Sequence, residues 1–147
     1  GSSAVYRNEN LQEITLPANV ATIGKWAFYG CSKLRNIAIP EGITTLDSYL
    51  LSNCSSLESV TIPSTVTIIG ERALENCTSL TTIELPNSLK EIGDYALSNC
   101  KGLTNVTIPE GVTYLGEDVF LACSSLQSVT LPTSLTTINN FMFHYCI

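Results

Sequence analysis

The amino-acid sequence predicts a solenoid, a coil of short stacked turns with a parallel β-sheet along one face. Two observations predict this fold. Cysteine recurs every 23 residues, and proline recurs with the same spacing over the whole chain of 147 residues. Two infrequent residue types with one common period indicate an internal repeat, and periods of about 20–50 residues are typical of solenoids. The six cysteines are Cys31, Cys54, Cys77, Cys100, Cys123 and Cys146, and the six prolines are Pro17, Pro40, Pro63, Pro86, Pro109 and Pro132.

Each repeat begins with a leucine, so the repeat boundaries follow from the sequence. We divide the single domain, 1–147, into a partial repeat, 1–10, and the repeats 11–33, 34–56, 57–79, 80–102, 103–125 and 126–147. Their common pattern is LxxIxIPxxVxxIGxxAFxxCxx. Repeat proteins need polar capping turns, because an open end exposes core residues. Neither end of the sequence resembles such a cap, so we expect the chain to be an excerpt of a longer array.

The first element of each repeat is a short β-strand. In residues 57–63 the apolar Val60 and Ile62 alternate with the polar Ser59 and Thr61, the period-two pattern of a strand with one buried face. Stacking equivalent strands in parallel gives a sheet along one side of the coil. Proline ends each strand, because it has no N–H for a further ladder bond and sets φ for a turn.

A second short apolar piece, such as Val66 and Ile69, follows the proline turn. The next position carries glycine, with Asp47 and Asn139 as its only substitutes, which predicts a left-handed backbone with φ above zero. The final Ala-Phe-x-x-Cys piece is too short for a stable helix. We therefore expect a helical turn there, with its larger side chain filling the core.

The leucine in every turn, the xIxI strand and the Cys-x-x-Leu step resemble leucine-rich repeats. The IP after the strand and the IGxxAFxxC behind it resemble the BspA-like (Treponema pallidum type) subfamily, over essentially the whole chain. The resemblance implies a right-handed coil with the parallel sheet on its concave face and short strands or helical turns elsewhere. It also implies a secreted or surface-attached protein of bacteria or some protists, with a role in adhesion. The match concerns the scaffold and leaves the ligand open.

The cysteines are expected to form a column of buried free thiols. An even number of cysteines in a secreted chain usually indicates disulfides. Here, however, equivalent residues of neighbouring turns lie about 4.7–4.9 Å apart with parallel Cα–Cβ vectors. A disulfide needs Cβ atoms about 3.8 Å apart that point at each other. A straight column also cannot ligate zinc tetrahedrally, and the sequence has no CxxC pair.

Charge and motifs exclude several classes of function. The net charge is −6 and only seven Lys and Arg residues are scattered along the chain, which argues against nucleic acid as a partner. No apolar stretch approaches the roughly 18 residues of a membrane span, so we expect no membrane insertion. The only histidine, His144, lies near Cys146, but the other five cysteines have no histidine beside them. We therefore predict no catalytic residues, no metal and no cofactor, and hence no enzyme.

Two sets of residues are candidates for binding. Outward strand positions form columns along the sheet, and Thr15, Glu84 and Thr107 belong to one of them. These residues also fit an ordinary solvated strand face, because threonine is favoured in strands. The second set combines aromatic and cationic side chains, a composition enriched in interfaces, although the rings also fit a structural role over the turn edge. It consists of Trp26, Tyr49, Lys25, Lys33 and Arg35.

These observations favour a protein-interaction or adhesion module of a secreted or cell-surface protein. We expect its partner to be a host or matrix protein, or another surface protein. Residues 1–46 carry a net charge of +1 and residues 47–147 one of −7, a gradient that can steer a partner. We expect a monomer, with end-to-end contacts where the termini are uncapped. The alternatives are a structural spacer that displays another domain and a regulatory array attached to a catalytic domain outside this chain.

Overall fold

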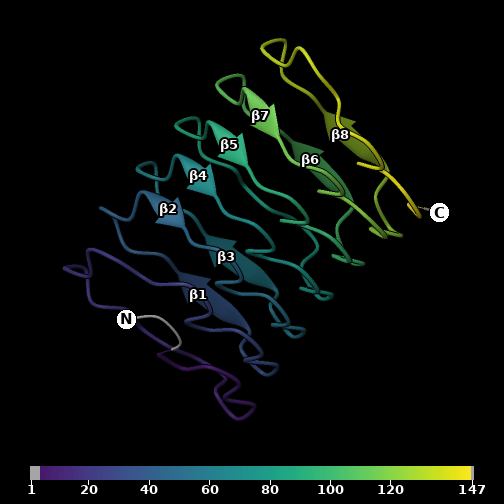
Figure 1. Ribbon diagram of the computed structural model, residues 1–147. Coiled ribbons are helices and arrows are strands. Elements are labelled where there is room, and N and C mark those ends of the chain that lie inside the picture. The colour runs from purple at the N-terminus through teal and green to yellow at the C-terminus, as the bar shows by residue number, and fades with distance from the viewer. Residues whose placement is uncertain (1–3, 147) are drawn as a thin grey trace.

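The computed structural model describes residues 4–146 and confirms the predicted solenoid (Figure 1). Its first face, here called the strand face, contains four of the short strands. The strand β1 pairs in parallel with β3, and β6 pairs in parallel with β8. Isolated bridges from Glu13 to Asn36 and from Thr82 to Asn105 add the two remaining turns to this face. The bounds are β1 Asn36–Ala38, β3 Ser59–Thr61, β6 Asn105–Thr107 and β8 Ser128–Thr130.

A second face consists of two-residue strands that form a four-stranded parallel sheet in the order β2-β4-β5-β7. All strand pairs on both faces join residues 23 positions apart, as in Thr45↔Ile68 and Asn105↔Ser128. One sequence repeat is therefore one turn of the coil. The bounds are β2 Thr45–Leu46, β4 Ile68–Ile69, β5 Glu91–Ile92 and β7 Tyr114–Leu115.

The prolines connect the two faces through tight turns. The carbonyl of Pro63 accepts a hydrogen bond from Val66 N–H at 3.1 Å, and the equivalent bond runs from Ile43 N–H to Pro40 at 3.3 Å. In the next residues, hydroxyl groups bond to the preceding turn, as Thr65 Oγ1 does to the Ile43 carbonyl at 2.8 Å. Each strand thus ends where proline removes a donor, and the chain turns toward the second face.

The segment that leads to each cysteine closes the cross-section, and we call its successive copies the turn edge. The predicted helical turn is wrong here, since residues 4–146 contain no helix. Consecutive tight turns take its place, with Leu50 N–H bonded to Asp47 and Ser52 N–H bonded to Tyr49. The N–H groups between them bond to the next turn of the coil, as Leu51 does to Ala73 at 2.8 Å. A helix would need those donors for itself.

The positive φ predicted at the glycine position is wrong, and the structure gives a different reason for glycine there. Gly70, Gly93 and Gly116 do not have a positive φ. The positive φ values lie two residues later, at Tyr49 (59°) for example, and again at Asn53 (63°). At Gly70, Gly93 and Gly116 the missing side chain leaves room for the neighbouring turn, which passes close by. A Cβ at Gly93 would lie 2.8 Å from the Glu71 backbone nitrogen.

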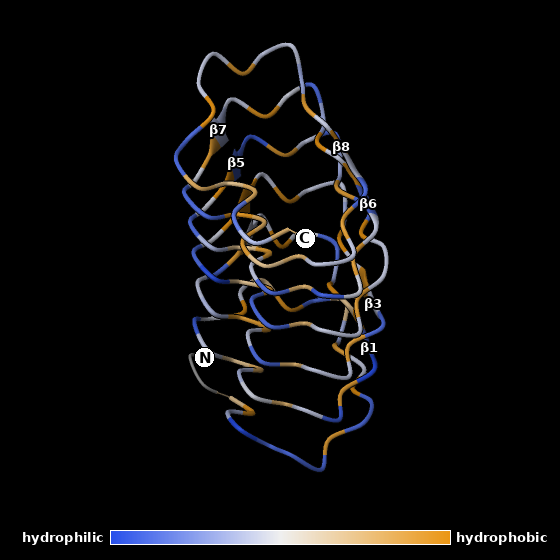
Figure 2. Ribbon diagram, turned by 90° about the vertical axis from the view of Figure 1, so that its right-hand side faces the viewer, coloured by the Kyte–Doolittle hydropathy of each residue, from blue (hydrophilic) through white to orange (hydrophobic). Residues whose placement is uncertain are grey.

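The core runs as a continuous column through the centre of the coil. Figure 2 shows apolar segments that recur at the same places in successive turns. The leucines that open the repeats, such as Leu57 and Leu80, are fully buried, and so are the larger turn-edge side chains such as Leu74 and Phe120. Because each turn buries its apolar side chains against the next, the stack stabilises itself through nearest-neighbour contacts.

Candidate functional site

The strand face carries a shallow trough that crosses several turns. It consists of three cavities of about 290, 250 and 390 Å³, which follow one another along the chain. Thr15 lines the first cavity, Glu84 lines the second and third, and Thr107 lines the third. All three side chains are exposed. The structure therefore brings the three strand-face candidates to one continuous surface.

Small polar side chains dominate the trough. Ser59 Oγ donates to Asn36 Oδ1 at 2.6 Å, and Ser128 Oγ makes the same bond to Asn105 Oδ1. These pairs hold the Asn side chains in place, and Asn105 Nδ2 also donates to Thr104 Oγ1 at 3.3 Å. Short hydroxyl and amide groups can hydrogen-bond an extended protein segment without a large entropic cost. Glu13 and Glu84 supply the negative charge of the trough.

The turn edge carries a ladder of stacked side chains. The rings of Trp26 and Tyr49 lie parallel with centroids 4.0 Å apart. The guanidinium of Arg72 follows, at 5.9 Å from the Tyr49 centroid and 4.4 Å from that of Tyr95. All four residues occupy the same repeat position and have φ values between 53° and 63°. Because the ring faces of Trp26 and Tyr49 contact each other, the ladder ties adjacent turns together.

Ion pairs and hydrogen bonds support this ladder. Arg72 Nη1 lies 3.0 Å from Glu75 Oε1, and its Nε lies 3.5 Å from Glu71 Oε1. The Tyr49 hydroxyl donates to Glu71 Oε1 at 3.2 Å. Burial and then the Glu71 carboxylate raise the pKa of Tyr49, and a hydrogen bond to a neighbouring carboxylate raises the pKa of Tyr95. The phenols remain neutral donors at neutral pH.

The three predicted cations do not join this ladder as a group. Lys25 is exposed and directly precedes Trp26. Lys33 and Arg35 are exposed at the start of the strand β1, and neither makes a cation–π contact with the rings among residues 4–146. The Arg35 backbone belongs to the strand face, because its N–H donates to the Gln12 carbonyl. Arg35 therefore lies on a different surface from the aromatic ladder, whereas Lys25 adjoins the ladder.

Sequence reasoning missed the residues that extend the aromatic cluster. Tyr6 stacks on Tyr29 with centroids 5.2 Å apart, and Tyr29 lies 5.2 Å from Trp26. The guanidinium of Arg7 lies 5.9 Å from the Tyr6 ring centroid. Tyr6 and Tyr29 are one repeat apart, so the period itself was the signal that could have paired them.

A second missed feature is a ladder of asparagine side chains on the turn edge. Asn76 Nδ2 donates to Asn53 Oδ1 at 3.0 Å, and Asn99 Nδ2 donates to Asn76 Oδ1. All three have a positive φ, which asparagine tolerates better than most residues. Their recurrence directly before three successive cysteines, Cys54, Cys77 and Cys100, was the available signal.

The thiols lie in a column with the sulfur atoms pointed at the preceding turn. Each sulfur donates to a backbone carbonyl, as Cys54 does to Phe28 at 3.2 Å and Cys77 does to Leu51 at 3.4 Å. All six are free, five are buried and Cys146 is half-buried. Burial, followed by the Cys31 thiol, raises the pKa of Cys54 to about 12. The column provides packing and hydrogen bonds, and its raised pKa values disfavour nucleophilic thiolates.

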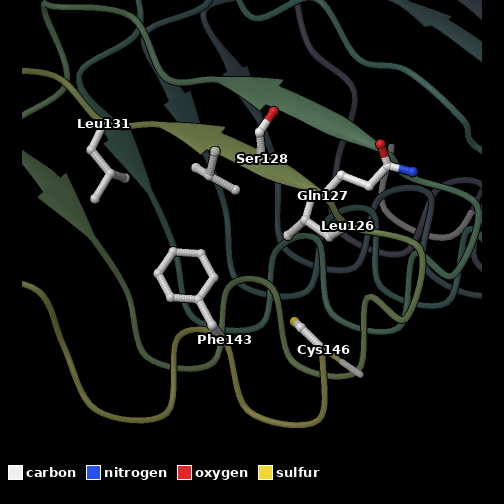
Figure 3. Close-up of a pocket in the computed structure, with 7 residues that line it drawn as sticks. Leu126, Gln127, Ser128, Leu131, Phe143 and Cys146 are labelled. Atoms are coloured by element: carbon white, nitrogen blue, oxygen red, sulfur yellow. The ribbon is translucent and has the colours of Figure 1, made fainter.

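The last described turn contains an apolar cavity of about 310 Å³ (Figure 3). Phe143 and Cys146 point across it toward Leu126 and Leu131. His144 is exposed, and its ring stacks on Tyr145 with centroids 3.9 Å apart. Among residues 4–146, no group of three or more His, Cys, Asp or Glu side chains is placed to hold a metal ion. The same residues contain no helix long and apolar enough to cross a membrane.

A parallel solenoid with one exposed polar sheet defines the class of repeat proteins that present an extended surface. The family described as "BspA type Leucine rich repeat region" matches residues 1–60 and 49–147 in six copies. The chain therefore belongs to the BspA-type leucine-rich repeat family. Such repeats are generally protein-interaction modules, and members of the family are bacterial surface or secreted proteins.

Solved structures show the same fold. The leucine-rich repeat protein of T. pallidum superposes with a TM-score of 0.86 at 29% identity, covering 89% of this chain and 64% of that one. A leucine-rich repeat protein of Bacteroides ovatus gives 0.83 at 36% identity, with 89% and 36% covered. The pneumococcal vaccine antigen PcpA gives 0.68 at 25% identity, with 74% and 27% covered. The chain thus spans less than two thirds of these neighbours, and no curated protein matches it.

Proposed function

We propose that this chain is a protein-binding module of a secreted or cell-surface bacterial protein, and that it acts in adhesion. The observation that carries the proposal is the trough, which brings Thr15, Glu84 and Thr107 to one polar surface over several turns. An extended surface of this kind suits an extended segment of a host or matrix protein. The family, and the description of PcpA as a vaccine antigen, support an extracellular location.

The geometry also favours the trough over the aromatic ladder as the contact surface. In the ladder, the face of Trp26 is occupied by Tyr49 and the charge of Arg72 by Glu75. Groups that already have partners offer less to a ligand. The trough hydroxyls instead keep hydrogen-bonding capacity free, because each can accept as well as donate. The module binds as a monomer through this face.

Immobilised fibronectin, laminin and type I collagen can test the proposal with two matched variants. Thr107→Lys places a long cation in the trough, and Thr113→Lys adds the same cation at an exposed position of the same repeat outside it. We expect Thr107→Lys to weaken binding at least about tenfold, the effect of about 1.4 kcal/mol, and Thr113→Lys to leave it unchanged. Equal binding by both variants, or no binding by the unmodified chain, would contradict the proposal.

A parallel experiment distinguishes the ladder. Trp26→Ala and Lys25→Ala alter the turn edge and leave the trough intact. If either variant loses binding while retaining its circular dichroism spectrum and Thr107→Lys does not, then the turn edge is the contact surface and the trough is a solvated face.

A further inference from the structure

The strand face is interrupted between β3 and the following turn. At the start of each strand, a backbone N–H normally bonds to the preceding turn. Glu58 N–H donates to Arg35 at 2.8 Å, Thr104 N–H to Thr81 at 3.2 Å and Gln127 N–H to Thr104 at 2.8 Å. Between residues 58–62 and 81–85 the structure contains no such bond and no strand pairing.

The end of the strand is also unbonded at this junction, although the equivalent bond forms at only two of the other four junctions. Ile39 N–H donates to the Thr61 carbonyl at 3.0 Å, and Ile108 N–H donates to the Thr130 carbonyl at 2.9 Å. Ile62 occupies the equivalent position in its repeat, and its N–H has no bond to Glu84 across the gap. The gap is therefore open along its whole length.

A cleft lies in this gap. Its volume is about 250 Å³, and it is lined by residues 59–62 together with Thr82 and Glu84. The core beneath it is slightly uncovered, because Val60 and Ile83 are each 8% exposed, whereas Val106 in a paired strand is 2% exposed. The missing bonds and the more exposed floor thus mark this junction, whereas cavities of about 290 and 390 Å³ also lie at the bonded junctions on either side.

The other two sides of the coil are closed at this junction. On the second face β4 pairs with β5, and Gly93 N–H donates to Ile69 at 2.8 Å. On the turn edge, Leu74 N–H donates to Ala96 and Asn76 N–H donates to Ser98, each at 2.9 Å. The cysteine column also continues, with Cys100 Sγ bonded to the Leu74 carbonyl at 3.3 Å. Residues 4–79 and residues 80–146 are therefore joined along the second face and the turn edge and separated along the strand face.

We propose that this junction is a joint, at which residues 80–146 rotate against residues 4–79 by opening and closing the strand face. Closure would bond Thr81 N–H to the Glu58 carbonyl, as the equivalent groups are bonded at the other junctions, and Ile62 N–H to the Glu84 carbonyl, as at two of them, and would cover Val60. Closure is favoured because it would pair backbone N–H and carbonyl groups that are unbonded across the gap, and buried polar groups are normally hydrogen-bonded. Glu84 opposes it, since it is the only charged residue at a position otherwise occupied by Thr or Ala, and Glu is depleted in strands.

The joint gives the trough an adjustable shape. Thr15 lies on one side of it and Thr107 on the other, so rotation changes the distance between the two halves of the surface. The existence of the joint does not depend on the proposed function, because it can be measured in the free protein.

Amide hydrogen exchange, followed by NMR, tests whether the strand face is open at this junction. We expect the amides of Ile62 and Thr81 to exchange at least about 100-fold faster than their equivalents Ile39 and Thr104, which have partners. Equal protection would show that the strand face is continuous in solution and would overturn the proposal.

Paired spin labels test the rotation itself. Ala38→Cys with Thr107→Cys places labels on the strand face, and Thr44→Cys with Thr113→Cys places a matched pair outside it, also three repeats apart and across the same junction. All four positions are exposed, and a Cys146→Ser background removes the half-buried native thiol. A broader distance distribution for the strand-face pair supports the joint. Equal widths would mean a static cleft and would overturn it.

Discussion

Alkaline pH should destabilise this protein through its thiol column. Burial raises the pKa of Cys54 and Cys123 from 9.0 to about 12, and the pKa of Cys77 rises in the same direction. Above about pH 9 the unfolded chain loses these protons while the folded chain keeps them. The unfolded state then binds fewer protons, so the free energy of unfolding falls as the pH rises from about 9 to about 12. Below about pH 8 this contribution is fully present.

The size of the effect follows from the proton linkage. One pKa unit corresponds to about 1.4 kcal/mol, so each of Cys54 and Cys123 removes about 1.4 kcal/mol of stability between about pH 8 and about pH 10. Together they remove about 3 kcal/mol, and Cys77 adds to this loss. A change of that size is a large part of the stability of an ordinary domain, which is about 5–15 kcal/mol.

Urea unfolding at a series of pH values, followed by the fluorescence of Trp26 under reducing conditions, measures this loss. The Cys54→Ala variant provides the matched comparison, because it removes one titrating group. Its stability should fall by about 1.4 kcal/mol less than that of the unmodified chain between about pH 8 and about pH 10. If the two proteins lose stability equally, or if neither loses any, then the thiols do not titrate as a buried column and the reasoning is refuted.

Two further pairs of substitutions test the turn edge, with unfolding free energies at neutral pH as the measurement. Gly93→Ala should cost about 1–3 kcal/mol, because its Cβ would lie 2.8 Å from the Glu71 nitrogen. Gly111→Ala should cost less, since the nearest atom there is the mobile Lys90 Nζ at 3.0 Å and the nearest backbone atoms, the Asn87 and Leu89 carbonyl oxygens, lie at 3.2 Å. An equal cost would contradict the steric explanation. Asn76→Ala should cost about 1–2 kcal/mol through its lost hydrogen bond and its φ of 60°. Asn76→Gly should recover part of that loss, and if it does not, the positive φ is unimportant.

The repeat period was sufficient to predict the solenoid. Cysteine and proline recurring every 23 residues identify equivalent positions, and parallel stacking of equivalent positions places the strands side by side. The alternation around Val60 correctly predicted which side chains point inward. These features depend on local patterns that recur in every repeat.

Other features depend on contacts between turns, which the pattern of one repeat does not specify. Gly70 and Asp47 suggested a positive φ, but the constraint is the passage of the neighbouring backbone, which a single repeat cannot reveal. The turn edge was expected to be helical because the pattern does not show that Leu51 N–H bonds to the following turn.

The candidate site could be predicted in part. The columns of outward residues followed from the strand period, so Thr15 and Thr107 were identified, but the cavities that join them were not. Lys33 and Arg35 were grouped with Trp26 by proximity in the sequence, whereas Arg35 belongs to the strand face and Trp26 to the turn edge. The interruption after β3 has no counterpart in the repeat pattern apart from Glu84.

The most direct test of the proposed function is the affinity of the chain for immobilised matrix proteins, measured for the unmodified chain, Thr107→Lys and Thr113→Lys. Binding that falls at least about tenfold with Thr107→Lys and persists with Thr113→Lys is the predicted result. Binding that is absent from the unmodified chain, or equally affected by both substitutions, would contradict the assignment of the strand face as a protein-binding surface.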